Sequence, residues 1–335
     1  MNFFRTTSER IIISAGIIVW VISLCVVWQL ASTTAVRNKP TMEYQLLNPR
    51  LQAITEDQEE EYRARTIVNL QPLRQELLAM LGDQKGDAAF FIENLHTGAR
   101  AMWQEREKFI PASLLKVPLA IVVMKKVEAG DWNLARTMLS LEPQFKDKYF
   151  GALWQQPDGS QFAIQYLIEQ MLQYSDNTAT NMLYGNLAPL ERDDVYYHIG
   201  LANPEAPFEV AANRPLFQTL TARDLATFFR ALYNSTYITR HSSQHLLSVL
   251  TNTKFDKVLP TEIPREILVA HKVANFFTKN PDRPKNYHDC GIVYQPDRPY
   301  LFCFMTRGLA AEKAQQLIVQ MANTTYRYFA DYKSQ

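Results

Sequence analysis

The sequence has almost no net charge and few cysteines. Its 335 residues include 35 Lys+Arg and 34 Asp+Glu, which gives a formal net charge of +1. Without a basic surplus or a basic run, the chain lacks the charge footprint of a nucleic-acid-binding protein. Three cysteines and six histidines form no Cys-x-x-Cys pair and no cluster, so we expect no structural zinc site. Nothing in the sequence calls for a cofactor.

Repeats and low-complexity tracts are also missing, and an aromatic content of 12% is typical of a folded chain rather than a disordered one. The longest uncharged stretch lies near the N-terminus, where Ile11–Leu30 is almost wholly apolar. Twenty helical residues span roughly 30 Å, the thickness of the hydrocarbon core of a bilayer. Arg5 and Arg10 precede this stretch, and the next basic residue is Arg37. The positive-inside rule therefore predicts a cytoplasmic N-terminus.

We accordingly expect residues 1–10 in the cytoplasm, a transmembrane signal anchor over 11–31, and the rest of the chain outside the cell membrane. Residues 32–65 are polar, with an acidic run over 56–61, and are expected to form a solvated stalk. The alternative is a cleaved signal peptide. Its apolar core would be only roughly 7–15 residues long and would end at a small-residue cleavage site, which residues 32–35 do not resemble.

The remaining residues, 66–335, predict one domain of the α+β class. Hydrophobic periodicity indicates helices over 67–81, 113–126 and 309–332, and mainly helical segments over 134–187 and 221–250. Strands are expected over 88–92, 99–103, 267–273, 291–294 and 300–306. Because short turns join most of these strands, they should pair in an antiparallel sheet.

One tetrapeptide in the buried helix carries nucleophilic chemistry. Ser113 and Lys116 are three residues apart, so they share a helix face. Burial and the positive end of the helix dipole should lower the pKa of the Lys116 amine, which could then accept the proton of the Ser113 hydroxyl. The backbone N–H of Ser113 would face an oxyanion. Roughly one such tetrapeptide is expected by chance in a chain of this length, so the pair alone is a weak signal.

A second element about sixty residues further on makes the pattern specific. Ser175-Asp176-Asn177 would ordinarily be read as a turn and helix cap. Ser-x-x-Lys followed by Ser-Asp-Asn resembles the penicillin-recognising serine hydrolases, above all the class A β-lactamases. The resemblance covers about residues 67–332. It implies a β-lactamase/transpeptidase-like fold, in which a five-stranded antiparallel sheet is flanked by the terminal helices and joined to an all-helical subdomain.

The same resemblance implies the roles of four residues. Ser113 corresponds to the acylated nucleophile, and Lys116 to its proton acceptor. Ser175 corresponds to the hydroxyl that passes a proton to the leaving nitrogen, and Asn177 to the amide that contacts Lys116 and the substrate.

The third family motif, Lys-Thr-Gly, is altered in this chain. Lys272 fits the family lysine, but Val273 replaces the hydroxyl that would bind the substrate carboxylate, and Ala274 replaces the glycine. Losing one hydrogen bond to a charged group is worth roughly 1.5–3 kcal/mol. The backbone N–H of Asn275 would be the second oxyanion donor. Recognition of substrate should therefore weaken while the nucleophile remains.

Deacylation in the class A enzymes requires a glutamate with an asparagine four residues further on, and Glu209 has this spacing to Asn213. If Glu209 is instead a solvated loop residue, the acyl-enzyme would persist. The sequence thus predicts a membrane-anchored serine hydrolase acting on β-lactams or peptidoglycan-like amides. The alternatives are a penicillin-binding carboxypeptidase or transpeptidase without efficient deacylation, or a scaffold that has lost activity. No protein partner can be named.

Two of the three cysteines should face each other on a hairpin. Cys290 and Cys303 are symmetric about the turn at 295–298, which brings their β-carbons close to bridging range. Outside the membrane they could form a disulfide. Two buried thiols that pack as small apolar groups are the equal alternative.

Overall fold

The computed structural model describes residues 45–48, 69–198, 210–211, 214–215, 219–276 and 285–332. They belong to one compact unit, Tyr44–Gln335. The predicted anchor and most of the predicted stalk lie outside the described residues. None of the helices in the described ranges is long and apolar enough to cross a bilayer.

The described helices and strands follow one another along the chain as α3 (Gln71–Leu81), β1 (Ala88–Asn94), β2 (Arg100–Trp103), α4 (Lys116–Glu128), β3 (Met138–Ser140), β4 (Gln161–Ala163), α5 (Ile164–Gln173), α6 (Asn177–Gly185), α7 (Pro189–His198), β5 (Val210–Ala211), β6 (Arg214–Pro215), α8 (Ala222–Asn234), α9 (Arg240–Thr251), β7 (Val269–Phe276), β8 (Asn286–Val293), β9 (Tyr300–Arg307) and α10 (Ala311–Asp331).

The main sheet has five antiparallel strands in the order β2-β1-β9-β8-β7. This confirms the predicted α+β class and the five-stranded antiparallel sheet. Strand β1 is buried at all seven positions, because both faces of the sheet are covered, and its near-continuous apolar sequence reflects this. Strand β7 forms one edge of the sheet.

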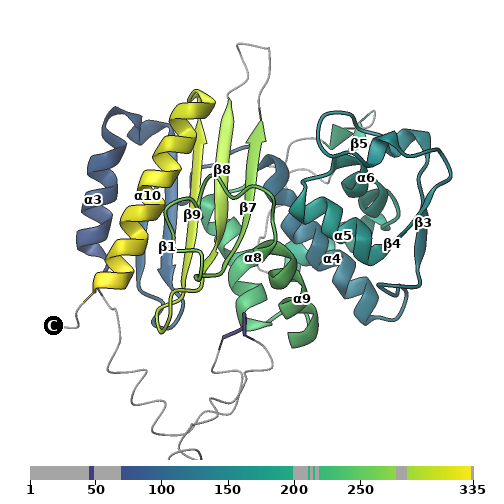
Figure 1. The fold of residues 1–335 in the computed structure, drawn as a ribbon, viewed down its shortest axis with the longest axis horizontal. Coiled ribbons are helices and arrows are strands. Elements are labelled where there is room, and N and C mark those ends of the chain that lie inside the picture. Colours follow the sequence, from purple (N-terminus) through teal and green to yellow (C-terminus); the bar gives the residue numbers. More distant parts are fainter. Residues whose placement is uncertain are drawn as a thin grey trace, which may run out of the picture. The chain divides into compact units, whose positions relative to one another are not determined.

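Helices of different parts of the chain cover the two faces. The terminal helices α3 and α10 pack on one face around a cluster that includes Leu77, Phe304 and Ile318. Helices α4, α5, α6, α8 and α9 lie on the other side of the sheet (Figure 1) and share a second cluster that includes Ile121 and Phe228. The altered Lys-Thr-Gly segment lies on the edge strand nearest these helices.

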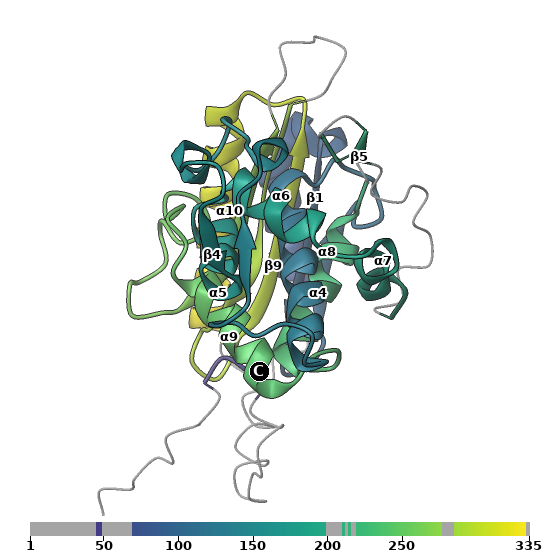
Figure 2. The same ribbon diagram turned by 90° about the vertical axis from the view of Figure 1, so that its right-hand side faces the viewer.

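The helical subdomain is less helical than the sequence predicts. Between α4 and α5 the chain forms the short antiparallel hairpin β3–β4 and irregular loops, which lie with α4–α6 in the part of the molecule that faces the viewer in Figure 2. The expectation of mainly helical structure from residue 134 was therefore wrong up to Ala163. Pro143 and Pro157, together with Gly151 and Gly159, favour turns over continued helix in this stretch.

Some predicted boundaries also shift. The first helix begins at Gln71 rather than residue 67, because Pro72 belongs to its first turn. Strand β8 begins at Asn286 rather than Gly291. Its first half contains the buried polar residues His288 and Asp289, which an apolar pattern does not detect.

Part of the predicted stalk packs against the domain. Leu46 and Leu47 are 4% and 2% exposed and belong to the cluster of the helical side. The Tyr294 hydroxyl donates to the carbonyl of Leu46 at 2.9 Å, and the backbone N–H of Asn48 donates to the carbonyl of Tyr233 at 2.8 Å. Residues 45–48 are thus part of the folded unit.

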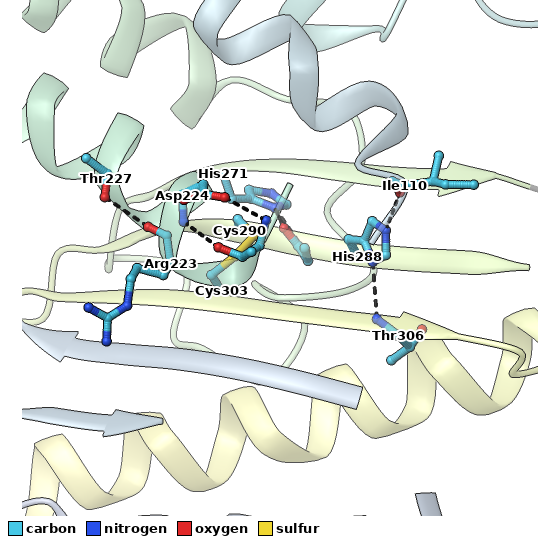
Figure 3. The surroundings of a disulfide bond; sticks show 11 residues. Ile110, Arg223, Asp224, Thr227, His271, His288, Cys290, Cys303 and Thr306 are labelled. Atoms are coloured by element: carbon cyan, nitrogen blue, oxygen red, sulfur yellow. Dashed lines mark hydrogen bonds and ion pairs between the residues drawn. A yellow bond between two sulfur atoms is a disulfide. The ribbon is translucent and has the colours of Figure 1, made fainter. Parts of the chain in front are cut away.

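Strands β8 and β9 are joined covalently. Cys290 and Cys303 are direct partners in the antiparallel register and form a disulfide, shown in Figure 3. Both side chains are fully buried.

Candidate active site

Ser113 lies at a change of helix type. Residues Ala112–Leu115 form a 3₁₀ turn, and the α-helix α4 begins only at Lys116. This short turn packs against β7 and β8, so Ser113 is held beside the edge of the sheet. The sequence predicted a continuous helix from Ser113; Pro118 in the first turn of α4 is compatible with the actual start.

Ser175 lies at the sharp junction between α5 and α6. Its φ of 55° is in the left-handed region, which reverses the chain there. Asp176 caps α6: its Oδ1 accepts the N–H of Ala179 at 2.8 Å, and its Oδ2 accepts the N–H of Leu153 at 2.9 Å. Both oxygens of a fully buried carboxylate are therefore used to fix the junction and a neighbouring loop.

A chain of hydrogen bonds joins the three expected proton-transfer groups. The Lys116 amine (Nζ) lies 2.6 Å from the carbonyl oxygen and 3.1 Å from the Oγ of Ser175, and 2.8 Å from Oδ1 of Asn177. Ser175 Oγ in turn lies 2.9 Å from Ser113 Oγ. We expected Lys116 to contact Ser113 directly. Among the described residues, the amine instead reaches Ser113 through Ser175, because both oxygens of Ser175 face it.

The surroundings of Lys116 favour the neutral form of its amine. Its side chain is 4% exposed, and burial, helped by the charge of Lys272, holds its pKa well below the usual 10.5 although Asp176 and Asp147 oppose the shift. A neutral amine has two N–H donors and one lone pair. The carbonyl oxygens of Ser175 and Asn177 can only accept, so in the neutral form they would take both donors. The lone pair would then be available for a proton from the Ser175 hydroxyl, whose Oγ lies 3.1 Å from Nζ.

Asn177 is oriented by a residue that the sequence did not single out. Its Nδ2 donates to Oδ1 of Asp147 at 3.3 Å, which leaves Oδ1 of the amide facing Lys116. The same Asp147 carboxylate accepts the N–H of Tyr149 at 2.8 Å. No sequence signal links Asp147 to Asn177, because the two residues are 30 positions apart in sequence and come together only in the folded chain.

Lys272 is completely buried beside this group. Its Nζ donates to the carbonyl of Val273 at 3.2 Å and lies 5.2 Å from the centre of the Phe255 ring. Burial lowers the pKa of Lys272 to about 7, and the charge of Asp289 only partly opposes this. Phe255 was not predicted as a site residue, since it lies in the loop between α9 and β7.

The edge strand presents backbone groups to the same place. Tyr294 donates its N–H to the carbonyl of Leu268, which fixes the alternation of the antiparallel ladder. The backbone N–H and C=O groups of residues 270, 272 and 274 therefore bond to β8, and those of residues 273 and 275 point away from the sheet. The N–H of Asn275 therefore points toward the open edge, as an oxyanion donor requires. The side chain of Val273 is 4% exposed and packs in the cluster of the terminal helices.

Glu209 and its partner Asn213 lie outside the described residues. In the sequence, Glu209 directly precedes β5 (Val210–Ala211) and Asn213 directly precedes β6 (Arg214–Pro215). The deacylating role of Glu209 stays a prediction. Within the described ranges no three His, Cys, Asp or Glu side chains are grouped so that they could hold a metal ion.

The chain as a whole is similar to known proteins. A family model described as the beta-lactamase enzyme family matches residues 72–329. The extended-spectrum beta-lactamase PER-1 of Pseudomonas aeruginosa is 23% identical over 235 residues, which cover 66% of this chain and 76% of that protein.

Solved structures agree with this match. The structure of PBP-A is 26% identical and superposes with a TM-score of 0.69, covering 78% of this chain and 97% of that one. A variant of PBP-A, solved as an acyl-enzyme complex with penicillin G, is 25% identical with a TM-score of 0.67, covering 78% and 98%.

Proposed function

Because this chain belongs to the beta-lactamase enzyme family, as a class A-like member, we propose that it is a membrane-anchored serine hydrolase outside the cytoplasm. It forms an acyl-enzyme on Ser113 with β-lactams or with peptidoglycan-like amides. The observation that carries this proposal is the hydrogen-bonded link from Ser113 through Ser175 to Lys116.

The link provides a route for the proton of the nucleophile. As Ser113 Oγ attacks the carbonyl carbon, its proton passes to Ser175 Oγ, and the Ser175 proton passes to the lone pair of Lys116. The carbonyl oxygen gains negative charge and is stabilised by the N–H groups of Ser113 and Asn275. When the C–N bond breaks, the proton passes from Lys116 through Ser175 Oγ to the leaving nitrogen. The product is an ester on Ser113; the amine departs from a peptide-like amide and stays attached to the acyl group when a β-lactam ring opens.

Two features support slow turnover as the second candidate function. Val273 offers no hydroxyl to the substrate carboxylate, and a variant of PBP-A solved as an acyl-enzyme complex with penicillin G is among the similar structures. If Glu209 does not activate water, the ester on Ser113 persists, as in a penicillin-binding carboxypeptidase or transpeptidase. A scaffold without activity is the weakest alternative, since it has no need of a buried lysine hydrogen-bonded to Ser175 and Asn177.

A chromogenic cephalosporin assay combined with intact mass after penicillin G separates these functions. Steady turnover that Ser113→Ala abolishes supports a β-lactamase, and Glu209→Gln should then trap the adduct. A stable adduct on Ser113 with little turnover supports a penicillin-binding protein. If wild-type protein gives neither turnover nor an adduct with several β-lactams, the acyl-serine proposal is wrong.

The proposed location rests on the apolar stretch Ile11–Leu30. The disulfide between Cys290 and Cys303 supports an oxidising compartment for the domain. Full-length protein should remain with the membranes after alkaline extraction, and external protease should digest the domain in cells made permeable only at the outer envelope. Release of the protein by alkaline extraction would contradict the anchor.

A further inference from the structure

The chain just before Ser113 has an unfavourable backbone conformation. Ala112 has a φ of 46°, in the left-handed region that costs a residue with a β-carbon about 1–2 kcal/mol. Pro111 precedes it with its φ fixed near −74°. A conformation of this kind persists only when neighbouring groups hold it.

A side chain from β8 stabilises this conformation. His288 Nε2 lies 2.9 Å from the carbonyl oxygen of Ile110, and the backbone N–H of Thr306 donates to His288 Nδ1 at 3.1 Å. Figure 3 shows the ring between these two partners. Since Nδ1 accepts an N–H, the hydrogen of the neutral ring must be on Nε2, where it faces the Ile110 carbonyl.

The surroundings keep this ring neutral and fixed. His288 is fully buried, and burial lowers its pKa to about 4. The ring of Phe109 meets it edge to face at 6.0 Å. The backbone of Phe109 is itself paired with Leu220 through hydrogen bonds of 2.9 and 3.0 Å. Two successive residues, Phe109 and Ile110, are thus fixed immediately ahead of Pro111 and the strained Ala112.

From this geometry we propose that His288 is a positioning residue for the nucleophile. Its Nε2–H holds the Ile110 carbonyl against β8, which keeps Ala112 in its left-handed conformation and Ser113 Oγ within 2.9 Å of Ser175 Oγ. The inference rests on the proposed role of Ser113. Without this hydrogen bond, the backbone of Ala112 leaves the left-handed region and Ser113 moves away from Ser175.

The test compares three variants of the full chain by the rate of penicillin G acylation, measured by rapid quench and intact mass. His288→Leu has no donor and should acylate about 10²-fold more slowly, the effect of a displacement of roughly 1 Å, with little change in initial penicillin binding. His288→Gln retains an N–H that reaches Ile110 and should recover most of the rate. Thr325→Val removes a buried hydroxyl that bonds to Met321 on α10 and should acylate like wild type.

A rescue variant separates positioning from a general loss of stability. In Ala112→Gly the left-handed conformation carries no strain, so adding this change to His288→Leu should restore the acylation rate at least tenfold. If His288→Leu does not fold, His288→Asn replaces it, since its shorter amide cannot reach the Ile110 carbonyl. A folded variant without the donor that acylates as fast as wild type would overturn the proposal.

Hydrogen exchange gives a second measurement that does not depend on substrate. Amides of residues 112–114 should exchange faster in His288→Leu than in wild type and not in Thr325→Val. If wild-type protein forms no adduct, the proposed function fails, and exchange alone decides the positioning role. Unchanged exchange at 112–114 would then refute it.

Discussion

The hydroxyl of Ser175 connects two groups that the sequence places on one helix. Lys116 and Ser113 are near neighbours in sequence, yet the hydrogen bonds between them run through Ser175. The serine also supplies its backbone carbonyl to the amine. At the scale of single residues, therefore, the second motif lies on the proton route that we propose for Ser113.

The variant Ser175→Ala tests this route. It keeps the carbonyl contact to Lys116 but removes the hydroxyl, so acylation by penicillin G should slow by about 10²–10⁴-fold, the usual range for a lost general base. Thermal unfolding checks that the domain is intact. An acylation rate within about threefold of wild type would mean that the proton reaches Lys116 by another path.

The lowered pKa of Lys272 predicts that the stability difference between wild type and a variant without this amine depends on pH. Its pKa is about 7 in the folded protein and near 10.4 when unfolded, so between these values the unfolded state binds more protons. Wild-type stability should therefore rise with pH across this window, relative to a variant without the amine. Lys272→Met should be more stable than wild type at pH 6, and its advantage should shrink by about 2 kcal/mol between pH 7 and 9. Urea unfolding of both proteins at each pH measures this; a constant difference would contradict the lowered pKa.

The loop that contains Gly151 packs closely against the start of α6. Gly151 lies in the loop after β3, and a β-carbon on it would be only 1.9 Å from Oδ2 of Asp176. This carboxylate caps α6 and holds Leu153, so the loop can approach the start of α6 only with glycine at this position.

Gly151→Ala should lower the free energy of unfolding by about 2–4 kcal/mol, from overpacking together with a strained φ. Gly130→Ala is the matched control, because Gly130 has the same φ of 86° and no atom within 4 Å of the added carbon. The free energies of unfolding of the two variants, measured by chemical denaturation, should differ only by the cost of the clash with Asp176. Equal losses would show that the contact with Asp176 is unimportant.

The covalent link between β8 and β9 gives a second prediction at this scale. The disulfide closes a loop with a sequence separation of 13, for which chain entropy predicts a stabilisation of about 3 kcal/mol. Cys290→Ala with Cys303→Ala should lose about this amount, and dithiothreitol should destabilise wild type but not the double variant. The absence of any effect of reductant on wild type would mean that the cysteines are not bridged in the protein.

At the scale of the whole molecule, a segment that the sequence assigned to the stalk belongs to the core. Leu46 and Leu47 are buried against helices that lie almost two hundred residues further along the chain. We expect Leu46→Ala and Leu47→Ala each to lower the unfolding free energy by about 2–5 kcal/mol. Leu190→Ala, at a site 86% exposed, should change it by less than about 0.5 kcal/mol. If the buried and exposed leucines behave alike, residues 45–48 do not dock in solution.

Local patterns predicted elements well where burial is one-sided or complete. The sheet was predicted from the apolar runs of β1 and β9 and from the turn between Cys290 and Cys303. Its flanking helices were predicted from the apolar periodicity at both ends of the domain. Patterns failed where buried polar residues replace apolar ones, as at His288 and Asp289 in β8, and where loops and a short hairpin occupy residues 134–163. In those segments the conformation of a residue depends on its tertiary partners, and the apolar periodicity of the sequence contains no information about those partners.

The sequence by itself determined the order of the motifs, the candidates for the reactive groups and the class of the fold, because these depend on residue type and on short-range spacing. It also determined the alteration at Val273 and Ala274. Only the tertiary structure decided that the amine of Lys116 reaches Ser113 through Ser175, that Asp147 orients Asn177, and that His288 lies under the strained turn. Each of these contacts joins residues that are distant in sequence, and the directions of their hydrogen bonds are set only when the sheet and the helical subdomain pack together.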